Sequence, residues 1–276
     1  MIPERQWKEL DFPYCYFAHA IDPQGDVDHF HYGLWEQGTR GIKEAQENMT
    51  RLLLSLIPRG IATILDVGCG LGTTAVTLAR TGGYTVVGIS PDRRLMELAR
   101  LRHGDSENPR FVIASLDQFS CDWPFDLILF QESVQYIPAL ELFSKCRTLV
   151  RPGGYLLMGD EFVYRQRNEF PFLPVKSELM AASRRAGFRL VLNEAITRQV
   201  LPTLDFGIRV LDRKDELLEA FRGYRPKAAE ELDELDRGWR TYRGLYEAGE
   251  LGYEIFLFRR RRGVRTLWRR VFAAGR

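Results

Sequence analysis

The sequence predicts an α/β fold: a Rossmann-like, seven-stranded, mostly parallel sheet with an antiparallel last strand, helices on both faces and a helical lid insertion. Three observations support this prediction. Short apolar runs alternate with helical patterns along most of the chain, an order that produces parallel strands joined by helices. A glycine-rich turn at residues 68–72 joins the first apolar run to a helix-forming stretch. The alternation stops at residues 198–250, where helical spacing continues until one final apolar run.

This pattern gives each part of the chain an expected role. The first 40 residues are aromatic-rich and irregular, and they are expected to pack over the sheet. The expected strands are residues 61–67, 84–90, 110–114, 125–130, 155–160, 188–196 and 252–258. One expected helix, 41–57, precedes the first strand, and the helices expected between the strands are 75–80, 93–103, 139–149 and 177–186. The expected segments are an N-terminal aromatic cap and helix (1–60), the core (61–197), the helical lid (198–250), the final core strand (251–260) and a basic amphipathic tail (261–276).

Size and composition fit a globular protein. The chain has 276 residues, 45% hydrophobic and 28% charged, enough for one α/β domain with an insertion. Its apolar runs are far shorter than the roughly 20 residues of a membrane span, and no basic-then-apolar signal peptide opens it. Four scattered cysteines without a C-x-x-C pair indicate reduced thiols, so a cytoplasmic protein is the simplest interpretation.

The glycine-rich turn predicts a nucleotide-type cofactor. Glycines let the backbone turn sharply and approach a ligand, and the helix start offers unpaired N–H groups. Dinucleotide-binding proteins use G-x-G-x-x-G to place a pyrophosphate on that helix start. Here Asp66 precedes Gly68, Gly70 and Gly72, with Cys69 inside the turn. A carboxylate there repels a pyrophosphate but can bind an ammonium group, such as the one on the methionine part of S-adenosylmethionine (SAM).

Two stretches carry a family resemblance. Residues 61–74 resemble the glycine-rich first motif of the class I SAM-dependent methyltransferases. Residues 29–36 resemble the H-x-Y-G-x-W-E segment that precedes the SAM domain in small-molecule methyltransferases of the sugar, tocopherol and cyclopropane-synthase-like group. The resemblance spans residues 28–260. It implies methyl transfer from SAM to a small molecule, with S-adenosylhomocysteine (SAH) as product, and an aromatic side chain, Tyr32 or Trp35, that closes over SAM and lines the substrate pocket.

The resemblance also assigns further cofactor contacts. In the family, an acidic residue at the end of the second strand usually binds the ribose. This chain has Ser90 at that position, as in the Gly-Ile-Ser variant of the group, and Asp92 two residues later. Which of the two binds the ribose stays open. Gln131, at the end of the fourth strand, is expected near the transferable methyl. The positions that match the adenine contacts are Ser115, Leu116 and Asp117, although a turn and a helix cap would favour the same residue types.

Methyl transfer is an in-line displacement, which mainly requires positioning and the exclusion of water. No metal and no enzyme nucleophile are needed, and G-x-S-x-G, H-E-x-x-H and P-loop motifs are absent from the sequence. His29 and His31 alternate like metal ligands on a strand, but no Cys/Asp/Glu cluster accompanies them, so we predict no metal site. An O, N or C acceptor that loses a proton during the transfer requires a base to take it up. The candidates are Glu132, Tyr136, Asp160, Glu161 and one of His29 and His31.

Several features leave the acceptor open. Residues 132–136 and 142–144 are similar to a strand-end segment of bacterial prenyl diphosphate C-methyltransferases, in which a Glu matching Glu132 removes a proton after methylation of an alkene. This implies an apolar, natural-product or isoprenoid-like acceptor, methylated at O, N or C. The alternative is a SAM-fold protein that catalyses a non-methylating reaction, such as a cyclisation or an isomerisation.

The C-terminal tail is strongly basic. Residues 259–276 hold eight Arg and no acid, although the net charge of the chain is only +2. Apolar residues recur there at helical spacing, which predicts a basic amphipathic helix for peripheral contact with a membrane or a partner. Packing on its own subunit, or on a second copy as a homodimer, is equally compatible. We expect no nucleic acid, because the basic residues occupy one short tail without interleaved stacking aromatics.

Overall fold

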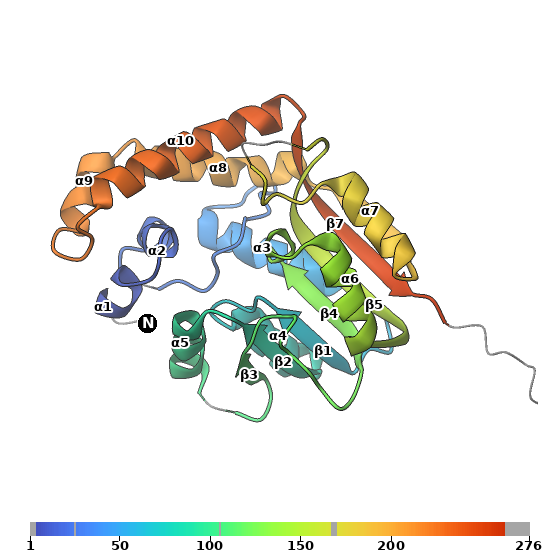
Figure 1. Cartoon of the computed structure of the whole chain (residues 1–276). Helices are drawn as coiled ribbons and strands as arrows, with labels where there is room; N and C mark the ends of the chain where they lie inside the picture. The colour runs from blue at the N-terminus through green and yellow to red at the C-terminus, as the bar shows by residue number, and fades with distance from the viewer. Residues whose placement is uncertain (1–3, 25, 105, 167–169, 263–276) are drawn as a thin grey trace, which may run out of the picture.

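The computed structural model describes residues 4–24, 26–104, 106–166 and 170–262. One sheet has the strand order β3-β2-β1-β4-β5-β7-β6 (Figure 1). β7 is antiparallel to both of its neighbours, and the other six strands run in one direction, which confirms the predicted sheet. The bounds are β1 (Thr63–Val67), β2 (Thr85–Ser90), β3 (Arg110–Ile113), β4 (Phe125–Gln131), β5 (Val150–Val163), β6 (Phe188–Ala195) and β7 (Leu251–Arg260).

Three helices pack on one face of the sheet. They are α3 (Ile42–Ser55), α4 (Thr73–Gly82) and α5 (Arg93–His103). Their apolar side chains share a core cluster with Ile64 of β1 and Leu127 of β4. α4 begins directly after the glycine turn, so its N-terminus faces the carboxyl end of β1.

Two helices pack on the opposite face, where Figure 1 shows them on the viewer's side of the sheet. They are α6 (Ala139–Leu149) and α7 (Lys176–Arg185), and they share a second cluster with Leu65 and Ile128. Neighbouring residues of one strand point to opposite faces, so a sheet covered on both faces requires apolar residues in succession. This explains why the inner strands β1 and β4 consist mostly of consecutive apolar residues.

The insertion before β7 is helical, as predicted. It consists of α8 (Thr197–Leu211), α9 (Lys214–Ala220) and α10 (Ala228–Glu247). Gly207 permits a close approach of α8 and α10, because a Cβ built at this position would lie 1.1 Å from the Trp239 ring. The helices extend over the end of the sheet at which the parallel strands terminate (Figure 1).

The prediction that the first 40 residues are irregular was wrong in part. Two short helices form there, α1 (Glu4–Lys8) and α2 (Tyr14–Ile21). Trp7 and Tyr16 are fully buried against Phe221, which follows α9, so burial of aromatic rings stabilises helices too short to persist alone.

Between β4 and α6, residues Val134–Tyr136 form one 3₁₀ turn. Among the described residues, no helix combines the length and the apolar character that crossing a membrane requires. The predicted amphipathic helix of the tail falls on residues 263–276, which lie outside the described residues, whereas Arg259 and Arg260 belong to β7.

Candidate active site

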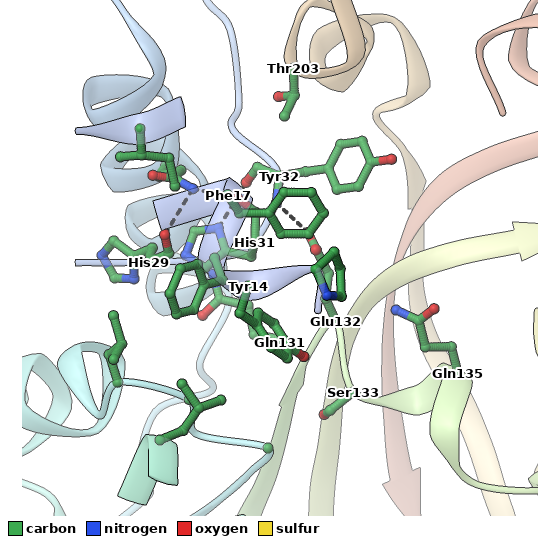
Figure 2. A pocket seen from close by; sticks show the side chains of 18 of the residues that line it. Tyr14, Phe17, His29, His31, Tyr32, Gln131, Glu132, Ser133, Gln135 and Thr203 are labelled. Carbon is green, nitrogen blue, oxygen red and sulfur yellow. Dashed lines mark hydrogen bonds between the residues drawn. The ribbon is translucent and has the colours of Figure 1, made fainter. Parts of the chain in front are cut away.

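A cavity of about 790 Å³ opens where the parallel strands end. It lies beside the ends of β1, β2 and β4, where chain order in the sheet reverses, which is the usual ligand position in open α/β sheets. The insertion, α2 and the segment before α3 complete its wall. The side chains that line it include Tyr14, Phe17, His31, Tyr32, Asp66, Ser90, Asp92, Gln131, Glu132, Tyr136, Glu161, Phe170, Trp239 and Tyr242 (Figure 2 shows part of this wall).

The glycine turn forms one side of this cavity. Gly68, Gly70 and Gly72 have φ values of +75°, +52° and +77°, a left-handed conformation that favours glycine. The N–H groups of Gly68 and Cys69 both donate to the Ile89 carbonyl, at 2.8 and 3.1 Å. A Cβ on Gly68 would lie 2.5 Å from the Cβ of Ser133, so this position has no room for a side chain.

Asp66, the penultimate residue of β1, lines the cavity. Its side chain is only 2% exposed, and Oδ2 has no hydrogen-bond partner in the part of the chain that the structure describes. Burial raises the pKa of this carboxyl to about 7. Buried polar atoms are almost always paired in native proteins, so an unpaired carboxylate oxygen indicates a place for a ligand cation or donor.

The remaining predicted cofactor residues divide into two groups. Tyr32, Gly68, Cys69, Gly70, Ser90 and Gln131 line the cavity together with Asp66. Asp92 also lines it, while its carboxylate caps α5 by accepting from Leu95 N at 2.9 Å. Gly72, which caps α4, and Ser115, Leu116 and Asp117 are not among the lining residues.

A directional chain of hydrogen bonds crosses from His31 to the glycine-turn helix. His31 Nδ1 donates to the Tyr32 carbonyl at 2.8 Å, which leaves Nε2 to accept from the Thr50 hydroxyl at 3.2 Å. Thr50 Oγ1 accepts in turn from Gln131 Nε2 at 3.3 Å, and Gln131 Oε1 accepts from Thr74 Oγ1 at 3.0 Å. This tautomer is assigned because a carbonyl can only accept. With both ring nitrogens occupied, His31 acts here by holding Gln131 in place.

The two histidines of this segment are held neutral. Their rings lie 4.5 Å apart, and desolvation lowers the pKa of His29 to about 4 and that of His31 well below its ordinary value. Among the described residues, no group of three His, Cys, Asp or Glu side chains could hold a metal ion.

We expect the Thr50→Val variant to weaken this chain without a change in side-chain shape. His31 Nε2 and one Gln131 N–H then lose their partner, at a cost of about 1–3 kcal/mol. The melting temperature should fall and the KM for the predicted cofactor, SAM, should rise about tenfold, and Thr50→Ser should restore both. Thr81→Val, which removes an exposed hydroxyl on α4, is the matched control. An unchanged KM in Thr50→Val would show that the chain does not position Gln131.

Glu132 follows β4 in an unusual backbone conformation. It is the one described residue other than glycine with a positive φ, +57°, and such strain is often found at functional sites. Its Oε1 accepts from Tyr32 N at 2.7 Å and from the Tyr253 hydroxyl at 2.9 Å (Figure 2 labels Glu132 beside Tyr32). Desolvation, with repulsion from Asp160 and Glu161, raises the pKa of Glu132 well above its usual range.

Asp160 and Glu161 are adjacent on β5 and therefore point in opposite directions. Glu161 lines the cavity and accepts from the Tyr246 hydroxyl at 2.7 Å. Asp160 does not line it; its Oδ2 accepts from the backbone N–H groups of Val134 and Gln135, at 2.8 and 3.3 Å. Burial raises the pKa of each carboxyl to about 7. Asp160 therefore stabilises the turn after β4, whereas Glu161 faces the cavity.

Tyr136, the last predicted catalytic residue, lines the cavity but is 67% exposed. Its hydroxyl is hydrogen-bonded to that of Tyr14. Three residues of the site were not predicted from the sequence. Tyr246 donates a hydrogen bond to Glu161, Tyr253 donates one to Glu132, and Thr50 links His31 to Gln131. No local pattern could have found them, because 85 residues separate Tyr246 from Glu161 and 121 separate Tyr253 from Glu132.

We expect Asp66→Asn to stabilise the ligand-free protein increasingly as the pH rises from about 4 to about 7. The parent carboxyl stays protonated up to about pH 7 when folded, whereas in the unfolded chain it ionises near pH 4. The unfolded parent therefore binds fewer protons in this window, so its free energy of unfolding falls as the pH rises. Denaturant unfolding of both proteins at several pH values gives the difference between their free energies of unfolding. The neutral histidines contribute equally to both proteins, so their opposite pH dependence cancels in this difference. A difference that is independent of pH would contradict the assigned pKa.

Residues 64–154 match a family model described as a methyltransferase domain. The chain is 29% identical over 158 residues to the 27-O-demethylrifamycin SV methyltransferase of Amycolatopsis mediterranei, which covers 55% of this chain and 58% of that protein. It is 28% identical over 246 residues to the O-methyltransferase resE of Aspergillus sclerotiorum, covering 81% of this chain and 86% of that protein.

Among solved structures, the fold is similar to that of the cyclopropane synthase MmaA2 from Mycobacterium tuberculosis. The TM-score is 0.74 with 18% identity, over 93% of this chain and 96% of the other. At this identity the likeness concerns the fold. The chain spans little more than half the length of the rifamycin-related relative that it matches.

Proposed function

Because the chain belongs to the class I SAM-dependent methyltransferases, we propose that it transfers the methyl group of SAM to a small-molecule acceptor and releases SAH. The observation that carries the proposal is Asp66. A buried carboxylate with an unpaired oxygen lies beside a glycine turn at the ligand-binding end of the sheet. The ammonium group of SAM would pair with it, and the N–H groups around Gly70 would approach the rest of the methionine part.

The cavity would hold the cofactor and the acceptor in two compartments. The cofactor compartment is formed by the ends of β1, β2 and β4, with Ser90 and Asp92 beside the ribose and Gln131 near the methyl. The adenine contacts assigned to Ser115, Leu116 and Asp117 stay a prediction. The acceptor compartment, as we propose it, lies under α2 and α10, where aromatic side chains predominate.

The bound sulfonium supplies an electrophilic methyl group. We propose oxygen as the acceptor atom, supported by the O-methyltransferases among the relatives. A lone pair of the acceptor oxygen forms the new C–O bond, the electrons of the C–S bond pass to sulfur, and the hydroxyl proton passes to the Glu161 carboxylate. A base with a pKa near 7 is well matched to this role at neutral pH.

Incubation of the full chain with methyl-tritiated SAM and pools of hydroxylated apolar compounds tests this function. We expect tritium in an organic-extractable product and SAH in equal amount. SAH binding without any transferred label, together with a changed acceptor, would instead support the non-methylating cyclase or isomerase alternative. Failure of both SAM and SAH to bind would overturn the proposal.

The contact predicted between residues 259–276 and a membrane stays a prediction, as does a homodimer. Co-sedimentation with anionic liposomes, before and after deletion of residues 263–276, tests the first, and analytical ultracentrifugation tests the second.

A further inference from the structure

We propose that the acceptor is an uncharged, largely apolar hydroxyl compound, and that the site excludes molecules with an anionic group near the reacting oxygen. The inference rests on the proposed function and deepens it, because it concerns the acceptor half of the same cavity. It follows from one juxtaposition: two carboxylates form the floor of a compartment whose walls are aromatic.

The walls of this compartment come from three separate parts of the chain. Phe17 of α2 lies 5.4 Å from the Trp239 ring of α10, measured between ring centroids. Phe170, in the segment before α7, lies 4.9 Å from the Tyr242 ring. All four rings line the cavity. Such a wall favours an occupant that presents rings or alkyl groups, since burial of apolar surface is the main source of affinity there.

The floor of the compartment is acidic. Glu132 and Glu161 both line it, and the charge of the Glu161 carboxylate helps to raise the pKa of Glu132, so Glu161 is the group that supplies the negative charge of the floor. A phosphate or carboxylate on the acceptor would add a further negative charge in a poorly solvated place, where like charges repel strongly. The floor therefore discriminates against acceptors such as phosphate esters and diphosphates.

The neighbouring polar groups do not offset this charge. The hydroxyls of Tyr246 and Tyr253 already donate to the two carboxylates, and the two histidines are neutral. Among the described residues, the cavity wall contains no Lys or Arg. An acceptor phosphate would thus have no described cation to pair with.

A cation at the reacting end is excluded for a different reason. A protonated amine has no lone pair for the attack, and it would face the positive sulfonium of the donor at bonding distance. A hydroxyl avoids both problems, because it is neutral when bound and loses its proton only as the new bond forms.

Three probes that share one ring system test the inference: 2-(2-naphthyl)ethanol, its phosphate ester and the corresponding primary amine. The alcohol and the phosphate ester are titrated calorimetrically into the full chain saturated with SAH, whereas the amine is incubated with the full chain and SAM, because SAH lacks the positive sulfonium. We expect the alcohol to bind at least tenfold more tightly than the phosphate ester, and the amine to give no methylated product at neutral pH. A phosphate that binds as tightly as the alcohol, a methylated amine, or an alcohol that fails to bind up to its solubility would each overturn the inference. The preceding SAH titration separates these results from failure of the proposed function, which would abolish SAH binding itself.

Variants locate the origin of the discrimination. Glu161→Gln should reduce the preference for alcohol over phosphate several-fold while SAH still binds. Glu230→Gln, at an exposed position of α10 that does not line the cavity, should leave the preference unchanged. Equal preferences in the parent and Glu161→Gln would show that the acidic floor is not what selects the acceptor.

Discussion

Replacement of Asp66 by Asn is expected to weaken SAH binding by about 100-fold, equivalent to about 2.7 kcal/mol. The change keeps the size of the side chain, removes its charge and replaces one carboxylate oxygen by an N–H donor. A hydrogen bond between two charged groups contributes more than a neutral one, and the loss is larger in a buried place than at the surface. Because the Asp66 carboxylate is 2% exposed and Oδ2 is unpaired, its charge is available for the ligand.

Two measurements separate lost binding from lost folding. Calorimetric titration with SAH gives the affinity, and thermal melting without ligand gives the stability. We expect the ligand-free Asp66→Asn protein to melt no lower than the parent at pH 8, since an uncompensated buried charge has been removed. Asp205→Asn, which removes a carboxylate paired with Arg243 at the surface, serves as the matched control. Parent-like affinity in Asp66→Asn would remove the main support for a SAM site.

The sheet and most helices could be predicted because their signals are local. The structure has α5 and α6 at the predicted bounds, residues 93–103 and 139–149. Strands buried on both faces have a continuous apolar pattern that needs no knowledge of their neighbours. α2 was missed for the converse reason. The stretch Tyr14–Ile21 contains little besides aromatic and small apolar residues, so it has no polar face to reveal a helical period.

The candidate site could be predicted only in its cofactor half. Asp66 and the glycine turn are consecutive in sequence, so their geometry follows from one strand, one turn and one helix. The acceptor half is assembled from α2, the segment before α7 and α10, whose meeting depends on tertiary packing. Alternation along β5 indicates that Asp160 and Glu161 face opposite ways, but only the packed structure shows that Glu161 is the one beside the ligand space.

Replacement of Glu161 by Gln is expected to lower kcat by about 100-fold or more, within the usual contribution of a general base. The amide still fills the same space and can accept from the Tyr246 hydroxyl, but it cannot take up the acceptor proton. SAH affinity should change little, because Glu161 lies in the acceptor compartment. In the parent, kcat should rise with pH and level off above a pKa near 7, since only the ionised carboxylate acts as a base.

Three comparisons make this test specific to Glu161. Glu161→Asp should retain part of the activity, because a carboxylate remains although it is withdrawn by one methylene. Glu230→Gln, at an exposed position of α10 outside the cavity wall, should keep the parent kcat. The acidic limb of the pH profile should disappear in Glu161→Gln. If Glu161→Gln keeps both this limb and the parent kcat, the role of the base would have to be assigned to Glu132. The Glu132 carboxylate lines the same cavity and accepts hydrogen bonds from Tyr32 N and the Tyr253 hydroxyl.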